Sequence, residues 1–209
     1  RKFRRKIMEF KNLRVKPLHK FPQYLIGCCD LLNDEWPRSR TARMMSLEAS
    51  SDKLPTSLIL LDEEVLLGHC KLTPIPSLPN SCFLEAVVIK KSMRGKKLGT
   101  HLMRCVEEYC WNVLRLDMIH LSTKGQEQFY AKLGYEVCPP ISIFGSSIPN
   151  ISTATTSIQK VDLKPAAPYI VGRNPPPPPP PLPCPAPITA STIKTSKTYM
   201  CKHLVCPTK

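Results

Sequence analysis

The segment SMRGKKLGTHL (residues 92–102) directly follows the apolar run CFLEAVVI (residues 82–89). An apolar run of this length predicts a buried strand, and apolar residues that then recur every three or four positions from Leu98 to Val113 predict an amphipathic helix. The first turn of a helix carries unpaired N–H groups and the positive end of the helix dipole, which favour phosphate. We therefore expect a phosphorylated ligand over Arg94, Gly95, Lys96, Lys97, Leu98, Gly99 and Thr100.

Further patterns on both sides of this segment predict a mixed α/β (α+β) domain. Apolar runs separated by a short polar turn indicate a hairpin, and glycine ends helices at a left-handed position. The expected elements are a short strand from Arg14, a helix over 22–33, a hairpin over 55–75, strands at 82–89 and 118–123, a short helix ended by Gly134, and a strand from Tyr135. Alternation of strands and helices favours a sheet flanked by helices.

The composition changes after about Ser146, where Ser and Thr and then proline dominate. Prolines 175–181 predict a polyproline II rod of roughly 22 Å at about 3.1 Å per residue. The segment KTYMCKHLV (197–205) again alternates like a strand. We expect a basic tail at 1–13, the domain at 14–145, a Ser/Thr- and Pro-rich loop at 146–196, and a last strand within 197–209 that returns to the sheet.

The net charge of +14 is concentrated at the N-terminus, where residues 1–20 hold nine Lys or Arg against Glu9. A solvated tail is the simpler interpretation, since no aromatic-interleaved RNA-binding pattern accompanies it. No apolar run approaches the roughly 18 residues of a membrane span, and no secretory signal is present. We expect a cytosolic protein without membrane or nucleic-acid partners, in which residues 1–7 belong to a longer chain or precede a start at Met8.

Ten cysteines lie mostly inside apolar runs, which favours buried, reduced thiols. Cys201, His203 and Cys206 offer three metal ligands, but a structural zinc site takes four, at tighter spacing. The sequence therefore predicts no metal.

The strand, the RGKKLG loop and the later FYAKLGY (129–135) together resemble the GCN5-related N-acetyltransferase (GNAT) superfamily. That resemblance implies acetyl-CoA as acetyl donor, with its pyrophosphate on an R/Q-x-x-G-x-G/A loop. Lys97 stands where the motif prefers glycine. A P-loop is excluded because its pattern is absent. The resemblance also implies cofactor contacts from the backbone of Val87, Val88 and Ile89, and from Gln126 and Tyr130.

The segment DLLNDEWPRSRTAR (30–43) resembles more narrowly NatH, the N-terminal acetyltransferase family that modifies processed actin. The resemblance implies an acidic N-terminus as substrate, and guanidinium groups pair well with carboxylates. We expect an extended cationic loop here, with substrate contacts from Trp36, Arg38, Ser39, Arg40, Thr41, Arg43 and Lys124. A proline insert also occurs in that family, and residues 175–183 suit the polyproline groove of profilin, which carries actin.

Acetyl transfer to an amine needs a proton acceptor and a proton for the departing thiolate. Tyr130 is the candidate acid, with ordinary aromatic packing as its alternative role. Glu85 and His120 are candidate bases, either of which could instead be structural. Two alternative hypotheses are a GNAT enzyme with another amine substrate and a non-catalytic adaptor whose proline segment binds profilin or SH3 domains.

Overall fold

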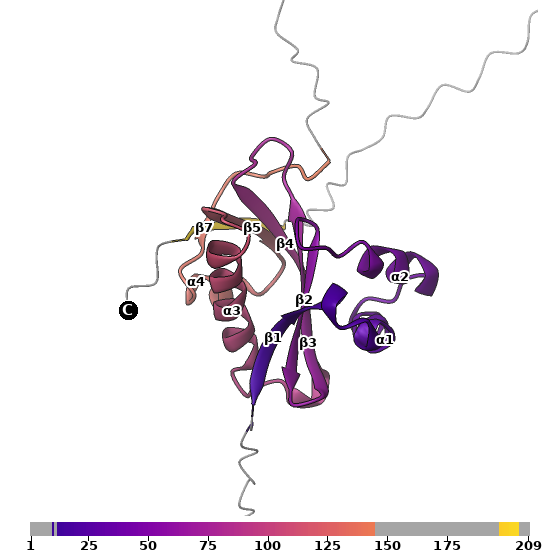
Figure 1. Ribbon diagram of the computed structural model, residues 1–209. Coiled ribbons are helices and arrows are strands. Elements are labelled where there is room, and N and C mark those ends of the chain that lie inside the picture. The colour runs from indigo at the N-terminus through magenta and orange to yellow at the C-terminus, as the bar shows by residue number, and fades with distance from the viewer. Residues whose placement is uncertain (1–9, 11, 145–196, 205–209) are drawn as a thin grey trace, which may run out of the picture. The chain divides into compact units, whose positions relative to one another are not determined.

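A computed structural model describes residue 10, residues 12–144 and residues 197–204 of the 209-residue chain. These residues form a seven-stranded sheet in the order β1-β2-β3-β4-β5-β7-β6, and helices flank both of its faces (Figure 1). The strands are β1 (Leu13–Pro17), β2 (Thr56–Asp62), β3 (Val65–Pro74), β4 (Ser81–Ile89), β5 (Met118–Thr123), β6 (Glu136–Val137) and β7 (Thr198–His203). The helices are α1 (Leu25–Glu35), α2 (Arg40–Glu48), α3 (Leu98–Asn112) and α4 (Glu127–Ala131), with 3-10 turns η1 (Leu18–Lys20), η2 (Pro22–Tyr24) and η3 (Lys91–Met93). The predicted mixed, mostly antiparallel sheet flanked by helices is confirmed.

Each face of the sheet has its own apolar core. On β2, Leu58 and Leu60 belong to the cluster under α3, whereas Ile59 and Leu61 belong to the cluster under α1 and α2. Because successive side chains of a strand point to opposite faces, a strand covered on both sides reads as a continuous apolar run. This explains the run SLILL at 57–61. Within the described ranges, no helix combines the length and hydropathy needed to cross a bilayer.

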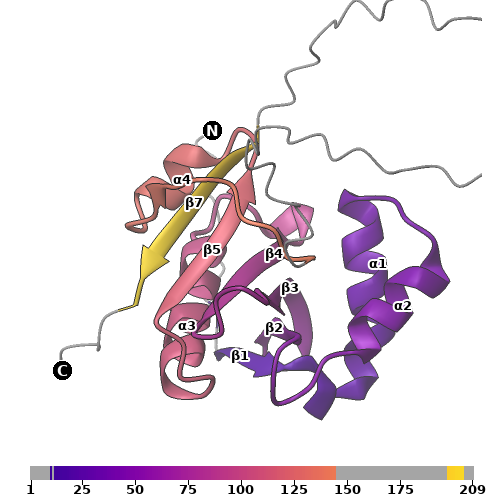
Figure 2. The same ribbon diagram turned by 90° about the horizontal axis from the view of Figure 1, so that it is seen from above.

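The sheet opens between β4 and β5, the one parallel pair among the described strands. Their pairing runs from Ser81 opposite Met118 to Leu84 opposite Leu121 and stops there. Beyond Leu84, β4 continues beside β3 to Ile89, while no described strand pairs with its other edge. The two strands therefore diverge, as the view from above shows (Figure 2).

A β-bulge in β4 lies at this opening. The register moves from Lys71 opposite Glu85 to His69 opposite Val88, so β4 has one residue more than β3 over this stretch. Ala86 has a left-handed φ of 54°. The buried His69 donates from Nδ1 to the Ala86 carbonyl oxygen at 3.3 Å. This hydrogen bond holds the bulge in place.

The last strand, β7, lies antiparallel between β5 and β6. Lys202 on β7 reaches across to α3, where its Nζ donates to Glu107 Oε2 at 2.7 Å, and it also donates to the Leu133 carbonyl at 2.7 Å. The tail at 1–9, the segment 145–196 with its polyproline, and Cys206 lie outside the described residues. The four-part division of the chain therefore stays a prediction.

Candidate active site

The loop before α3 has the backbone of an anion site. Gly95 has a φ of 76° and Lys97 a φ of 62°, so the chain turns through two left-handed positions before the helix begins. Within the described part of the chain, the N–H groups of Gly95 and of residues 97–100 donate to no backbone oxygen. A run of free N–H groups at the N-terminus of a 15-residue helix suits a phosphate or diphosphate.

The unpaired edge of β4 lies close to this loop along the chain. Val88 and Ile89 pair with His69 and Gly68 of β3 on one edge, and the β5 side of the same residues has no strand partner in the described structure. Backbone groups of residues 87–89 are therefore available to an extended ligand that lies in the opening.

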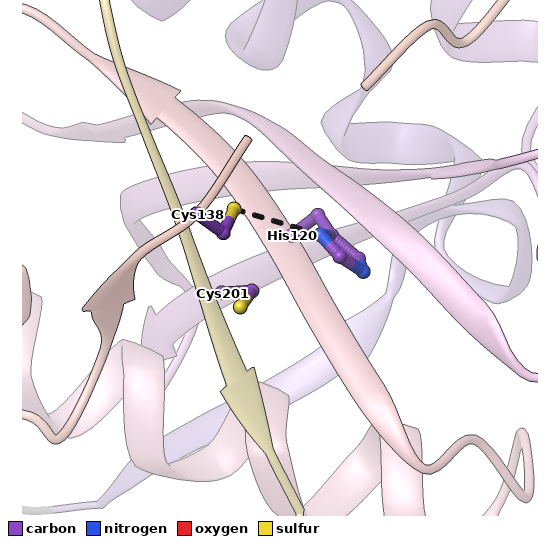
Figure 3. A group of neighbouring side chains, drawn as sticks. All are labelled: His120, Cys138 and Cys201. Atoms are coloured by element: carbon purple, nitrogen blue, oxygen red, sulfur yellow. Dashed lines mark hydrogen bonds between the residues drawn. The ribbon is translucent and has the colours of Figure 1, made fainter. Parts of the chain in front are cut away.

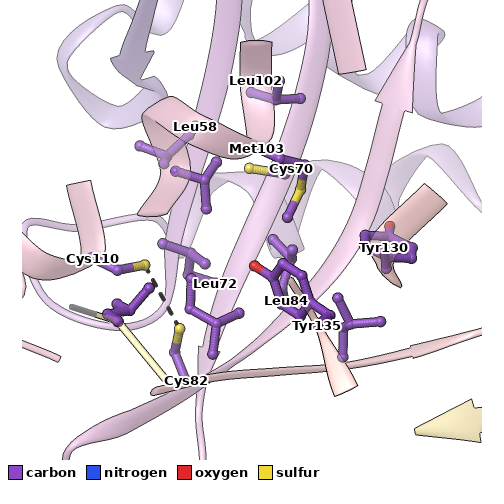
Figure 4. Close-up of a cluster of buried hydrophobic side chains, with 14 of the residues drawn as sticks. Leu58, Cys70, Leu72, Cys82, Leu84, Leu102, Met103, Cys110, Tyr130 and Tyr135 are labelled. Carbon is purple, nitrogen blue, oxygen red and sulfur yellow. Dashed lines mark hydrogen bonds between the residues drawn. The ribbon is translucent and has the colours of Figure 1, made fainter. Parts of the chain in front are cut away.

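Tyr130 lies on the α3 side of the sheet, within the buried cluster drawn in Figure 4. Its ring packs edge-on against Phe129 at 5.0 Å and Tyr135 at 5.8 Å between ring centroids. Burial raises the pKa of Tyr130 to about 12, so the hydroxyl stays protonated at neutral pH. A Cβ on Gly99 would lie 3.4 Å from the Phe129 ring, an ordinary van der Waals contact, so α3 packs against α4 at this glycine.

Glu85 and His120 lie on the opposite face. Leu84, Ile119 and Leu121 belong to the α3-side cluster, so the alternating residues Glu85 and His120 point toward the face that carries α1 and α2. Glu85 Oε1 accepts a hydrogen bond from Thr73 Oγ1 at 2.7 Å and lies 3.8 Å from Lys71 Nζ.

His120 is 7% exposed, and its Nε2 has no hydrogen-bond partner among the described residues. Burial, and next the nearby His203, lower the pKa of His120, so its imidazole is neutral at pH 7. The predicted acid and the two predicted bases thus lie on opposite faces of the sheet. Glu85 directly follows Leu84, where the pairing of β4 with β5 stops, whereas His120 lies within the paired stretch, opposite Phe83.

Residues 25–135, more than half of the chain, match the acetyltransferase (GNAT) family. The chain belongs to this family. It is 35% identical over 154 residues to N-alpha-acetyltransferase 80 of Mus musculus, a match that covers 70% of this chain and 48% of the relative. The GNAT chain described here therefore spans about half the length of that relative.

Solved GNAT structures share the fold at low identity. A mutant spermidine N-acetyltransferase from Vibrio cholerae superposes with a TM-score of 0.52 at 16% identity, covering 61% of this chain and 81% of that one. A GNAT acetyltransferase from Streptococcus pneumoniae gives a TM-score of 0.50 at 18% identity, covering 61% and 87%. These likenesses support the fold. The family uses acetyl-CoA as acetyl donor, and the free N–H groups in the loop and first turn of α3 fit its diphosphate.

The segment expected to be an extended cationic loop is largely helical, and that prediction is wrong from Arg40 onward. Ser39 is the N-cap of α2, and its side chain accepts from the Ala42 N–H at 3.5 Å. Arg40 pairs with Asp30 at 2.6 Å, and Arg43 donates to Asn33 Oδ1 at 3.2 Å and to a backbone carbonyl at 2.5 Å. The good helix formers after Ser39 were the signal for this helix.

Other predicted substrate residues remain exposed. Arg38 is exposed, and no hydrogen bond or ion pair joins it to another described residue. Trp36 is 44% exposed, and its carbonyl accepts the Arg43 hydrogen bond. Ser39 and Thr41 lie at the start of α2. Lys124 directly follows β5 and is therefore distant in sequence from the turn between α1 and α2. Arg38 and Trp36 are thus the exposed cation and the exposed aromatic ring between α1 and α2.

The Arg94 side chain has a structural role in addition to its place in the loop. It donates to the Ile89 carbonyl at 3.0 Å and to Glu35 Oε2 at 2.7 Å, while Lys91 Nζ donates to the Asp34 carbonyl at 2.6 Å. These bonds join the end of α1 to the loop beside a cavity of about 210 Å³. Glu35 was not among the site residues predicted from the sequence. Two acidic residues at a helix C-terminus oppose the dipole, which is a signal for a nearby cation.

Proposed function

We propose that this protein transfers the acetyl group of acetyl-CoA to the α-amino group of acidic protein N-termini, with processed actin as the substrate. The observation that carries the proposal is the run of free N–H groups at residues 95 and 97–100 beside the opening between β4 and β5. Similarity to an N-alpha-acetyltransferase supports an α-amino acceptor. The resemblance of residues 30–43 to the actin-modifying family supports the acidic substrate.

The predicted acid and bases suit this chemistry. Acetyl-CoA, when bound, supplies the acetyl group as a thioester. The Tyr130 hydroxyl has a pKa of about 12, so it is protonated at neutral pH and can donate this proton to the departing sulfur. An α-amino group titrates near pH 8, so a modest acceptor is sufficient. Glu85, whose side chain is about one-third exposed, is the proposed acceptor; His120 is more buried and directs Nδ1 toward Cys138.

The test uses the full chain with labelled acetyl-CoA and peptides that begin Asp-Asp-Asp, Glu-Glu-Glu, Ser or Met-Leu. We expect transfer to the acidic peptides, and a loss of about 10² to 10⁴ in turnover for Tyr130→Phe with retained CoA binding. Tyr135→Phe is the matched control, since that tyrosine lies in the same cluster. Transfer to neutral peptides alone overturns the acidic substrate, and transfer to no peptide favours the adaptor function.

Arg38 is the proposed carboxylate partner because it is exposed and unpaired among the described residues. Reversing its charge in Arg38→Glu should raise KM for acidic peptides about tenfold, which corresponds to about 1.4 kcal/mol, and leave neutral peptides unaffected. Arg104→Glu on α3 makes the same charge change on the other side of the sheet. An equal rise in KM for both variants would show that net charge, rather than Arg38, attracts the peptide.

We further propose that residues 175–183, outside the described residues, bind profilin and so bring profilin-bound actin to the enzyme in the cytosol. The support is the run of prolines, since polyproline docks into aromatic grooves and tethering raises the local substrate concentration. Deleting 175–183 should slow acetylation of profilin-bound actin and spare short peptides. Unchanged rates on both substrates would exclude tethering.

A further inference from the structure

Three metal-ligating side chains from distant parts of the chain meet on one face of the sheet. His120 comes from β5, Cys138 follows β6, and Cys201 comes from β7 (Figure 3). Their ligand atoms all lie within 4.8 Å of one another, and His120 Nδ1 is 4.0 Å from Cys138 Sγ. Backbone pairing brings them together, because His120 lies opposite Cys201 and Cys138 donates its N–H to Tyr199 at 2.9 Å.

We propose that His120, Cys138 and Cys201 bind one Zn²⁺ ion. Zinc bonds of about 2.3 Å to sulfur and about 2.0 Å to nitrogen, in tetrahedral geometry, separate the ligand atoms by about 3.5–3.8 Å. The observed separations, at most 4.8 Å and 4.0 Å between His120 Nδ1 and Cys138 Sγ, are longer than these values, so zinc binding requires the three side chains to rotate toward one another. Three protein ligands leave the fourth position to water, as in open zinc sites.

Zinc binding requires a neutral imidazole and two deprotonated thiols. The neutral imidazole of His120 has a free lone pair on whichever ring nitrogen lacks hydrogen. Burial, followed by the neighbouring Cys201, raises the pKa of Cys138 to about 11, so this thiol keeps its proton in the absence of metal. On binding, each thiol loses a proton to the buffer and forms a sulfur–zinc bond, without any change of oxidation state. Two thiolates then neutralise the charge of the cation.

Other cysteines in the described structure lack this combination. Cys82 and Cys110 lie 3.9 Å apart between sulfurs, but both are fully buried in the α3-side core. Cys105 lies 3.7 Å from His101 Nε2, with no second thiol in a ligand group there. Cys138 and Cys201, by contrast, are only partly buried.

The experiment titrates the reduced full chain with Zn²⁺ by calorimetry, without acetyl-CoA, so its result is independent of the proposed function. Co²⁺ serves as a spectroscopic probe, because thiolate coordination in a tetrahedral site gives intense visible absorption. We expect one ion per chain. Loss of even an outer partner of a metal ligand weakens binding by about 10- to 100-fold, so Cys138→Ser and Cys201→Ser, each losing a direct ligand, should weaken it by at least about 100-fold.

Two control variants make the result decisive, with circular dichroism verifying that every variant is folded. Cys105→Ser removes a thiol that also lies beside a histidine and should leave zinc affinity unchanged. Cys206→Ser tests whether the C-terminal CKHLVC segment holds the ion instead, and weakening equal to that of Cys201→Ser would overturn the proposed ligand set. Equal affinity of the wild type and the Cys138→Ser/Cys201→Ser double variant, or a Cys138–Cys201 disulfide under the same reducing conditions, would also overturn it.

Discussion

At the scale of single residues, Lys97 combines a backbone requirement with a side chain that does not suit it. Its φ of 62° is left-handed, and it is the last residue before α3. A residue with a Cβ pays about 1–2 kcal/mol in this region, whereas glycine adopts it without that cost. The backbone N–H that faces a ligand is the same for either residue.

Lys97→Gly should therefore raise the free energy of unfolding by about 1 kcal/mol, measured by urea denaturation. Lys97→Ala is the control, because it removes the ammonium group but keeps the strained Cβ. Equal stabilisation by both variants would assign the effect to charge rather than to the backbone. The CoA affinity of Lys97→Ala relative to the wild type then measures the contribution of the ammonium group alone.

At the scale of elements, Lys202 connects the last strand, β7, to α3 and to the segment before β6. Its Nζ bonds to Glu107 on α3 and to the Leu133 carbonyl before β6, and it lies 5.6 Å from the centroid of the Tyr135 ring. The side chains of Lys202 and Glu107 are 22% and 17% exposed. Removing one member of such a pair leaves a nearly buried charge without a partner.

Lys202→Met should lower the free energy of unfolding by about 3 kcal/mol, because Glu107 stays behind uncompensated. The double variant Lys202→Met/Glu107→Leu should recover most of that loss. For comparison, Asp30→Ala breaks the exposed pair with Arg40 and should cost less than about 1 kcal/mol. Chemical denaturation measures all three, and equal losses for the single and double variants would show that the pair is not coupled.

At the scale of the whole molecule, buried histidines make the free energy of unfolding depend on pH. Burial lowers the pKa of the fully buried His69 to about 4, against an ordinary value of 6.5. The unfolded chain then binds a proton that the folded protein excludes. Stability from this group is complete above pH 6.5 and is lost as the pH falls from 6.5 to 4. The lowered pKa of His120 acts in the same direction.

Between pH 6.5 and pH 4, His69 should remove about 3 kcal/mol of stability, or about 1.4 kcal/mol per pH unit. His69→Gln should show a slope smaller by that amount, whatever its stability at pH 7. Urea denaturation at half-unit pH steps measures both slopes. Parallel curves for the two proteins would show that His69 does not titrate between these states.

Local sequence patterns predicted the helices and strands whose apolar residues recur at a regular spacing. The hairpin over 55–75, the strand at 82–89 and the helix from Leu98 follow directly from apolar spacing. The helix at 40–48 was missed because an arginine-rich segment suggested a loop, although Ser39 was a capping signal. The bulge at Ala86 could not be predicted, since it depends on a hydrogen bond from the distant His69.

The candidate site was predictable where its chemistry is local. The loop from Arg94 to Gly99 and Tyr130 carry recognisable motifs. By contrast, the Arg94–Glu35 pair and the group formed by His120, Cys138 and Cys201 join residues that are far apart in the chain. Such groups depend on sheet register, which sequence spacing alone does not determine.

The position of β7 at the end of the chain affects when the sheet can be completed during synthesis. Domains begin to fold from the N-terminus during synthesis, but one edge of β5 and Cys201, one of the two sulfur neighbours of His120, depend on residues beyond the 145–196 segment. A nascent chain halted before residue 198 would expose the backbone of β5 as an open template for other strands. The time that the ribosome needs to add residues 145–197 therefore sets a lower limit on how long that edge stays uncovered.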